Sequence, residues 1–595
     1  MDQARQVVRT AAATRLAIGL AQGIVLFLLQ KADESKAWPA TQPMLYAPLL
    51  IGALMIPMIP LAALSAMRRP ALIIWSLITA TVAAVLAVHA AWTGAGPDRL
   101  GAGPLSPPLF IAVAALLFIA HHLVQPADAA RKPVAPYADY FDLAFTNLIR
   151  LFLSLAFTGA FWLLLFLAGA LFKLIGVEAI QKLIGETAFA FPATGLMFAA
   201  AVHMAVQLTE ARAGLVRGVR TVGLTLLAWL SPLMVVIAGG FLAALPFTGL
   251  APLWGTKAAT ALLLAAAAAL IILINAAYQD GVEPPHVIPQ WAARAAGLLL
   301  IPIVILAGYA LWLRIDQYGL TPDRVFASAY LVVAIGFTVG YALAALKPGP
   351  WMKPLEPTNL IMAAICVLLL IALFTPIADP ARLSVASQVK RLETGKVTAA
   401  KFDFRFLRFD AGRYGRDALD KLKAGRDPQV GRRAREVKAE ETRPLRPIEK
   451  PDYAAMTVYP AGAKLPDSFL NQDAGIASRG SCDGPASGCY AVLLDVDDDR
   501  SDEILLGSGQ TLDVFKLSEG RWRRVARTVS YCWVGDLRDD LKADPARMGQ
   551  PEPRRDLIIG RHALALVPVQ EGCPKRADGA AAPDPDFLIP SPPPR

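Results

Sequence analysis

The sequence is short of charge, of cysteine and of enzyme signatures. Only 18% of its 595 residues are Asp, Glu, Lys or Arg, against about 25% in ordinary soluble domains. This shortage excludes a soluble fold for the whole chain. No P-loop, HExxH or GxSxG motif occurs, which disfavours ATP-driven work and the hydrolases that carry those motifs. The five cysteines contain no CxxC pair, so a zinc site is not expected either.

Long apolar runs take the place of the missing charge. Hydrophobic residues make up 55% of the chain, and a membrane helix needs about 20 mainly apolar residues in a row. None of the runs alternates with period two, so helices are predicted and a barrel is not. The sequence predicts an all-α polytopic membrane bundle of about eleven spans, near residues 11–30, 42–66, 70–92, 106–125, 143–172, 187–207, 221–246, 257–278, 291–313, 325–346 and 358–377.

Apolar runs stop near residue 377, which divides the chain. Residues 1–377 are predicted to be the membrane domain, and residues 378–452 a juxtamembrane region of helix and linker. Residues 453–577 are predicted to form a small α+β, β-rich soluble module with disulfides. The proline-rich end, 578–595, is predicted to be disordered. The first span lacks a convincing cleavage site and is expected to stay as an anchor.

Lys and Arg in the short loops predict the orientation of the spans. Such residues favour the cytoplasmic side and meet anionic lipid there, so the net charge of +10 does not point to nucleic acid. The basic positions fall on one side of the predicted bundle: Arg5, Arg9, Arg15, Arg68, Arg69, Arg131, Lys132, Arg212, Arg217, Arg220, Lys347 and Lys353. We therefore expect a bacterial inner-membrane protein with a cytoplasmic N-terminus and a periplasmic C-terminal domain.

The segment after the last span argues against this orientation. It is basic, from Arg382 to Arg408, and a short loop of that kind would be cytoplasmic. Long domains, however, cross a membrane largely regardless of their charge. We therefore give the short loops more weight.

The cysteines support an outside location for the soluble part. Cys366 lies in an apolar span and is expected to pack there. The other four lie in the soluble part, and an even number in a modest domain is typical of disulfides in an oxidising compartment. We predict the pairs Cys482–Cys489, which brackets a flexible turn, and Cys532–Cys573, which is left by elimination. Four unrelated thiols are the alternative.

Two patterns describe the soluble part. Phe402, Phe404 and Phe406 alternate as they would in a strand with one buried face, between two predicted helices. From about residue 453, short apolar runs separated by Gly, Pro and Asp predict strands.

An acidic loop between two of those strands predicts a calcium site. Carboxylates at every second position can converge on one ion, and a later acid completes its shell. Arg500 stands where such loops want glycine, so an acidic turn that water or Arg500 neutralises is the alternative. The stretch resembles the loops of FG-GAP-type repeats. The predicted ligands are Asp495, Asp497, Asp499 and Glu503.

Two further stretches carry a family resemblance. "RIDQYGLTPDRVFA" (314–327) and "FDFRFLRFDAGRYGRDAL" (402–419) resemble the signatures of the bacterial DUF4153 family of multi-span membrane proteins. The resemblance covers the membrane domain and about 50 residues beyond it. It implies a helical fold in a bacterial inner membrane and no particular activity.

The first of these stretches also holds candidate binding residues. Thr321, Pro322 and Asp323 predict a helix start. Arg314 and Arg324 flank it, with Tyr318 between them, and two arginines can bind an anionic headgroup or substrate. Anchoring of helix ends at the interface is the alternative.

Ionisable groups inside the spans are the remaining candidates. His203 lies deep in its span, where a charge would cost roughly 2.5 kcal/mol or more, so it is either functional or a neutral ring bonded to another helix. Arg150 is near a span end and can snorkel or face a cavity. His121 and His122 are adjacent, cannot form an i, i+4 metal pair, and are expected at the interface. Ser387 and Lys390 match S-x-x-K, but no partner motif accompanies them.

These observations lead to two functional hypotheses. The first is a non-enzymatic membrane protein for transport or envelope maintenance, with a periplasmic sensor or docking module. The spans are poor in acids, which disfavours proton-coupled transport. The second is a membrane enzyme that acts on a lipid-linked or envelope substrate at the outer leaflet. Expected partners are the bilayer and an envelope protein or lipid-linked ligand, and calcium is the one cofactor predicted.

Overall fold

We analysed the protein as a computed structural model. It describes residues 2–94, 107–250, 253, 258–348, 350–425, 427–440, 456–470, 489–508, 511–527, 541, 557–559 and 562–564. The chain divides into two compact units, Met1–Thr442 and Arg443–Arg595. The predicted disordered tail, 578–595, lies outside the described residues.

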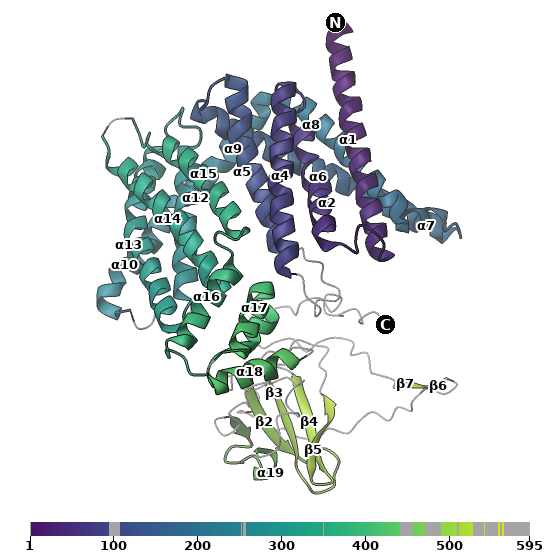
Figure 1. The fold of residues 1–595 in the computed structure, drawn as a ribbon, viewed down its shortest axis with the longest axis vertical. Coiled ribbons are helices and arrows are strands. Elements are labelled where there is room, and N and C mark those ends of the chain that lie inside the picture. The colour runs from purple at the N-terminus through teal and green to yellow at the C-terminus, as the bar shows by residue number, and fades with distance from the viewer. Residues whose placement is uncertain are drawn as a thin grey trace. The chain divides into compact units, whose positions relative to one another are not determined.

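The first unit confirms the predicted helical bundle. Within the described residues, eleven segments are long and apolar enough to cross a membrane, because their windows are rich in Leu, Ala, Ile and Val and hold few charges. Two of the segments are broken in the middle, and the others are continuous (Figure 1). They are α1 (Asp2–Glu34), α2 (Pro43–Met55) with α3 (Met58–Ala63), α4 (Arg69–Gly94), α5 (Pro107–Ala130), α6 (Tyr137–Leu174), α8 (Thr187–Ala211), α9 (Ala213–Ala228) with α10 (Ser231–Thr248), α12 (Ala259–Tyr278), α13 (Val287–Tyr318), α14 (Pro322–Leu346) and α15 (Leu355–Leu373).

Proline accounts for both breaks. Pro57 separates α2 from α3, and Pro232 stands at the start of α10. Proline has no backbone N–H and its ring crowds the preceding turn, so it interrupts a helix. Broken membrane helices free backbone carbonyls, and the carbonyl of Leu61 in α3 accepts a hydrogen bond from Arg15 at 2.9 Å.

The helices form two groups with separate cores. One core joins α2, α3, α4 and α5, and the other joins α10, α12, α13 and α14. Helix α15 packs on α14 and on α5, and Figure 1 shows it between the two groups. It therefore serves as a shared wall.

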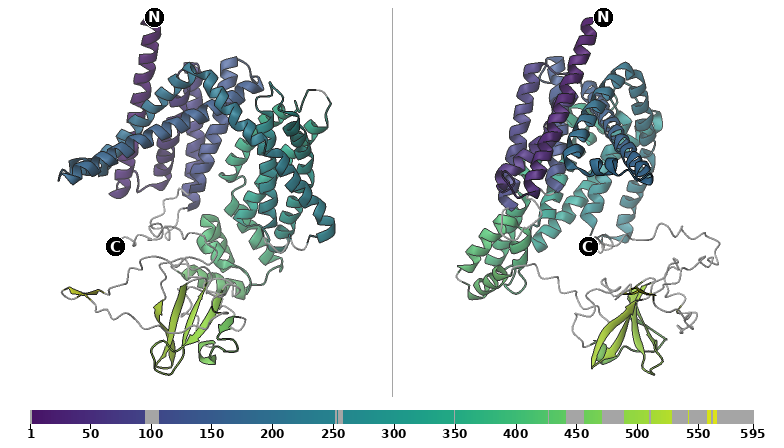
Figure 2. Two further views of the ribbon diagram at one scale, coloured as in Figure 1. Left: turned by 180° about the vertical axis from the view of Figure 1, so that it is seen from behind. Right: turned by 90° about the vertical axis from the view of Figure 1, so that its right-hand side faces the viewer.

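Small residues let α1 approach α8 closely. A Cβ built on Gly195 of α8 would lie 2.2 Å from the carbonyl oxygen of Gly19, and one on Gly23 would lie 2.4 Å from that of Phe191. Gly19 and Gly23 form a GxxxG pair, which allows this contact in a membrane. Figure 2 shows α1 running along the bundle, with its first turns beyond the other helices.

Three helices follow the last span within the first unit. They are α16 (Pro380–Glu393), α17 (Gly412–Lys423) and α18 (Pro428–Ala439). They share a small core that includes Leu407, Leu419 and Val430. The amphipathic pattern of α17 and α18 explains why one face of each is buried.

The predicted strand over Phe402, Phe404 and Phe406 is wrong. Phe402 and Phe404 are buried, but Phe402 lies in a bend and Phe404 begins a helical turn, which continues as the short π-helical turn η1 (Phe406–Asp410). The Asp403 carboxylate accepts a hydrogen bond from the Phe406 N–H at 2.9 Å. This local bond starts a helical turn where the described chain offers no neighbouring strand to pair with.

The second unit confirms the predicted β-rich module. A five-stranded sheet has the order β1-β2-β3-β4-β5, with β1 parallel to β2 and the other pairs antiparallel. Phe469 of the short helix α19 packs against Phe515 and Trp522. The strands are β1 (Thr457–Tyr459), β2 (Cys489–Leu494), β3 (Glu503–Ser508), β4 (Thr511–Ser518) and β5 (Arg521–Arg527), and a separate hairpin joins β6 (Leu557–Ile559) and β7 (His562–Leu564); α19 is Asp467–Leu470.

Candidate functional site

The predicted arginine cluster lies at the junction of α13 and α14. Thr321 caps α14, and its hydroxyl accepts a hydrogen bond from the Arg324 N–H, as the sequence predicts. The guanidinium carbons of Arg314 and Arg324 lie 5.9 and 5.5 Å from the centre of the Tyr318 ring. The three predicted residues are therefore brought together.

The two arginines differ in their bonding. Arg324 donates a hydrogen bond to the carbonyl of Gly319 at 2.6 Å. Among the described residues, Arg314 forms no hydrogen bond or ion pair, and its guanidinium contacts the Tyr318 ring. It is half-buried. A guanidinium carries five donors in a rigid fork, so Arg314 offers its donors to whatever enters the adjacent space.

An apolar groove begins at these arginines. It has a volume of about 790 Å³, within the roughly 300–1,000 Å³ of drug-sized ligand sites. Alanines of α12 leave the space, because their side chains are short. The groove is lined by Ala258, Thr260, Ala261, Leu264, Ala265, Ala268, Ile271, Leu311, Arg314, Asp323, Arg324, Ala327, Tyr330, Val333 and Ala334.

Helix α16 holds the loop between α13 and α14 in place. Arg391 donates to the carbonyls of Asp316 and Gln317 at 2.9 and 2.6 Å. The Ser387 hydroxyl accepts from the Leu320 N–H at 3.0 Å. Gly319 has a φ of +76°, and a Cβ there would meet Arg391 at 2.6 Å. The S-x-x-K match is therefore explained by loop anchoring, which the sequence did not indicate.

His203 of α8 and Arg150 of α6 lie elsewhere in the bundle. The Nδ1 atom of His203 is 3.1 Å from a guanidinium nitrogen of Arg15 in α1. Because arginine can only donate, this nitrogen accepts and the ring is neutral. The structure therefore agrees with the alternative of a neutral ring that is bonded to another helix. Arg15 itself is fully buried, although the sequence analysis counted it among the basic residues at the cytoplasmic side.

Arg150 faces a cavity and does not snorkel. Its Nε donates to the Thr209 hydroxyl at 2.8 Å and a second nitrogen donates to the Asn147 amide oxygen at 3.2 Å. His121 and His122 line the same cavity. They are 5% and 8% exposed, so they are buried within the bundle, and their expected depth near the interface stays a prediction. Neighbouring helices, which no sequence pattern identified, cover them.

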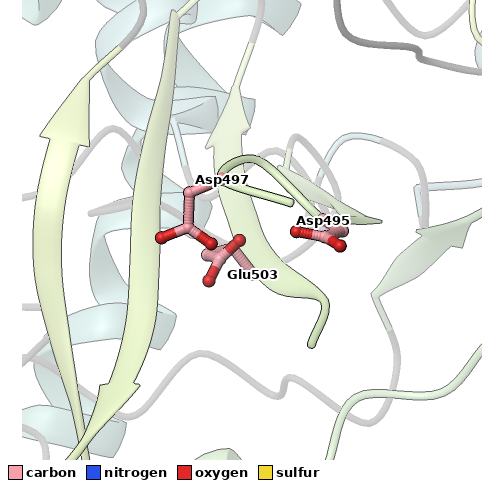
Figure 3. Close-up of side chains that lie close together, drawn as sticks. All are labelled: Asp495, Asp497 and Glu503. Atoms are coloured by element: carbon pink, nitrogen blue, oxygen red, sulfur yellow. The ribbon is translucent and has the colours of Figure 1, made fainter. Parts of the chain in front are cut away.

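The acidic loop joins β2 to β3 as predicted. Leu494 pairs with Glu503 at the base of the hairpin. Carboxylate oxygens of Asp495, Asp497 and Glu503 all lie within 4.8 Å of one another, and Figure 3 shows these three side chains around the turn. Asp499 is not among the three. Its Oδ1 accepts from the Ser501 N–H at 2.8 Å.

Two residues of this loop have the left-handed backbone conformation that glycine adopts most easily. Asp498 and Arg500 have φ values of +60° and +68°, at the positions where calcium loops of this type favour Gly. Side chains with a Cβ adopt this region at some cost. The Asp495 carboxylate supports the turn, because it accepts hydrogen bonds from the Asp499 and Arg500 N–H groups at 3.2 and 2.9 Å.

A lysine neutralises the loop, and the sequence analysis missed it. Lys516 of β4 forms ion pairs with Asp497, with Asp499 at 2.7 Å and with Glu503 at 3.5 Å. Asp497 and Asp499 raise the pKa of Lys516, and its ammonium lowers the pKa of Asp499. The alternation of β4 was visible, but only the strand pairing brings Lys516 opposite the loop. The predicted calcium site therefore already contains a cation.

Replacing Lys516 by methionine is expected to strengthen calcium binding at least tenfold. The wild-type lysine must leave before calcium can enter, and its loss frees three carboxylates. Radioactive calcium and equilibrium dialysis of the full chain in detergent would measure both affinities. The double variant Lys516→Met/Asp497→Asn is the control and should bind weakly. Absence of binding to Lys516→Met at millimolar calcium would leave the loop a lysine-neutralised turn.

Most cysteines of the predicted disulfides lie outside the residues that the structure describes. Cys482, Cys532 and Cys573 are among those residues. Cys489 begins β2 and is 5% exposed. Cys366 is a free, partly buried thiol in α15, in keeping with a packing role. The two pairings stay a prediction.

Comparison with known proteins gives one match. A model of a domain of unknown function, DUF4153, matches residues 49–422. The match covers the membrane helices from α2 onwards, the arginine cluster and most of α17. No curated protein matches the chain, and no solved structure does so.

Proposed function

The chain belongs to the DUF4153 family, and from this membership, its eleven membrane helices and the groove beside Arg314 we propose that it is a bacterial inner-membrane protein that binds an anionic amphiphile. The role that we assign to this binding is transport or envelope maintenance. The groove would hold the apolar chain, and the arginines would hold the charged head. The observation that carries the proposal is the guanidinium of Arg314, which has no ionic partner among the described residues and lies at the mouth of an alanine-lined groove.

The charge balance at this mouth favours an anion. Arg314, Arg324 and Arg391 gather there, against the exposed carboxylates of Asp316 and Asp323. Each Lys or Arg near a membrane surface contributes about 1 kcal/mol toward binding anionic lipid. Two arginines that act together give a preference of roughly tenfold or more over a neutral lipid.

Binding is favoured over catalysis at this groove. Of the lining residues that the structure describes, Asp323 alone carries a carboxylate, and none is a histidine, cysteine or serine. General acid–base chemistry needs two groups with different protonation states in reach of the substrate. The enzyme hypothesis therefore takes second place to a lipid-binding protein.

We also propose that the groove opens toward the periplasm. Contacts between helix ends support this orientation. Arg68 at the start of α4 pairs with Asp128 near the end of α5 at 2.7 Å, and Arg220 pairs with Asp142 and Asp280. These basic residues thus meet at one end of the helices, which the charge rule assigns to the cytoplasm. His89 and Asp379 meet near the end of α4 and the start of α16.

Alkaline phosphatase fused after Arg595 is expected to be active, because it folds only in the oxidising periplasm. The same enzyme fused after Lys132, in the predicted cytoplasmic loop, is the control and should be inactive. Colonies with a chromogenic phosphate ester would report both results. Activity at Lys132 and none at Arg595 would invert the proposed orientation.

The double variant Arg314→Gln/Arg324→Gln is expected to lose roughly tenfold or more in affinity for phosphatidylglycerol. Fluorescent phosphatidylglycerol, titrated against the full chain in a non-ionic detergent, would measure this loss. The matched control is Arg69→Gln/Arg217→Gln, which removes two exposed arginines elsewhere and should keep the affinity. The variant Ala265→Phe fills the groove at an exposed alanine and should also abolish binding. Equal affinity in all four proteins would contradict the proposal.

A further inference from the structure

A second cavity lies between α2, α3, α5, α6 and α8, far in sequence from the groove of α12–α14. It has a volume of about 220 Å³, smaller than the roughly 300–1,000 Å³ of drug-sized sites. Its ligand is therefore small, or only one end of a longer molecule enters. The lining residues belong to α2, α3, α5, α6 and α8: Met55, Met58, Ile59, Leu61, Ala62, Ala114, Leu117, Phe118, His121, His122, Asn147, Arg150, Leu151, Phe198, Val202 and Val206.

The polar side of this cavity consists of connected side chains. His122 Nδ1 lies 2.6 Å from the carbonyl oxygen of Phe118, so this nitrogen carries the proton and Nε2 accepts. The Asn147 amide nitrogen donates to that Nε2 at 3.1 Å. The Asn147 oxygen accepts from Arg150. The chain of bonds thus runs from a backbone carbonyl to a guanidinium.

His121 belongs to the wall of this cavity. The Trp75 indole N–H donates to its Nδ1 at 3.2 Å, so the proton of the neutral ring lies on Nε2. This Nε2 is buried in the cavity wall, and among the described residues it has no hydrogen bond of normal length. Gln125 lies one turn further along α5, and its Oε1 likewise has no bond of normal length among these residues. The Gln125 side chain is the hydrogen-bonding neighbour of His121, so this pair belongs to the cavity wall, and Arg150 is the charged donor among the lining residues.

Positive charge near the cavity exceeds negative charge. Arg15 is fully buried, and its bonds go to the carbonyl of Leu61, to His203 and to Ser65, all neutral groups. Leu61 is itself a lining residue. Arg150 has one acidic neighbour, Glu210, at 3.7 Å, and that side chain is 57% exposed. A buried charge without a counter-charge is costly.

We propose that this cavity binds the carboxylate of a small apolar acid. The carboxylate would take donors from Arg150 and offset the excess charge of the two arginines. The hydrocarbon would lie among Met55, Met58 and Phe198, which form the apolar side. Both methionine and phenylalanine offer apolar surface to such a chain. The methionine side chain is also flexible and can adapt to its shape. The site is independent of the groove beside Arg314.

Radiolabelled octanoate is the probe for this site. The full chain in a non-ionic detergent should bind one octanoate, and unlabelled octanoate should displace it. Unlabelled octanol, which has the same chain and no charge, should compete at least tenfold more weakly, because it forms no charge-assisted bond. Inorganic phosphate distinguishes the carboxylate of an apolar acid from a bare anion, and it should not compete.

Two variants test the location. Arg150→Gln should weaken octanoate binding roughly tenfold or more, because a charge-assisted bond is lost. Ala114→Trp keeps every polar group and fills the cavity from an exposed position, so it should abolish binding. Gel filtration would show whether both variants are folded. If one of them is not folded, His121→Phe takes its place in the test. Ala265→Phe, which fills the other groove, should leave octanoate binding unchanged.

The proposal is overturned by three results. They are octanol competing as well as octanoate, phosphate displacing it, and full binding by Ala114→Trp. Failure of phosphatidylglycerol binding at Arg314 has no bearing on this site. The two proposals can therefore fail separately.

Discussion

Replacing Gly195 by isoleucine is expected to separate α1 from α8 and to destabilise the membrane domain by about 3 kcal/mol or more. A Cβ at this position would lie 2.2 Å from a backbone oxygen of Gly19. Backbone cannot rotate away as a side chain can, so the helices must move apart. The polar contact between Arg15 of α1 and His203 of α8 would be lost with them. Heating the detergent-solubilised protein and measuring the monodisperse fraction would show a lower midpoint.

The matched control is Gly239→Ile. Gly239 also lies within a membrane helix, and nothing stands within 4 Å of a Cβ built there. Both changes replace a helical glycine by the same β-branched residue, so their propensity effects cancel. A midpoint for Gly195→Ile equal to that of Gly239→Ile would mean that α1 and α8 are not in close contact.

Replacing Arg220 by leucine is the second change with a large expected effect. Arg220 of α9 is buried and pairs with Asp142 and with Asp280, the latter at 2.8 Å. Its guanidinium also lies 5.2 Å from the centre of the Phe141 ring. Removing one partner of a buried ion pair costs about 3–5 kcal/mol. The value should fall at the lower end, because the Asp142 side chain is 40% exposed. The same heating assay would measure the loss.

Two further variants separate the ion pair from other effects. Arg217→Leu removes an exposed arginine three residues earlier on the same helix and should change the midpoint little. The triple variant Arg220→Leu/Asp142→Asn/Asp280→Asn should recover part of the stability, because no unpaired carboxylate remains. No recovery in the triple variant would show that lost packing, rather than charge, causes the effect.

The spans could be predicted from the sequence because each depends on its own composition. Among the described residues, eleven candidate membrane segments stand where eleven apolar runs were expected, and most of their ends lie within a few residues of those expected. The strands on both sides of the acidic loop were equally visible, because alternation is local. Phe402, Phe404 and Phe406 show the limit of such patterns. Their alternation predicted a strand, but a strand needs a partner to pair with, and the described chain offers none there.

The details of the candidate sites depend on which helices become neighbours. Nothing near Arg150 in the sequence points to Thr209, and nothing near Asp497 points to Lys516. Ser387 anchors a loop 67 residues earlier. One signal was present and overlooked: Gly19 and Gly23 form a GxxxG pair that predicts a tight helix crossing. That Arg314 has no ionic partner among the described residues could not be predicted, because an absent bond has no sequence pattern.

Helix α16 makes bonds to both helix groups. Asp379 at its start is 2.9 Å from His89 of α4, and Gln388 and Arg391 grip the loop that follows α13. A helix of 14 residues spans about 21 Å and is stiff at that length. It therefore connects the two helix groups at one end of the bundle and fixes the distance between them there. Any rocking of one group against the other would pivot about this end and open the bundle at the opposite one.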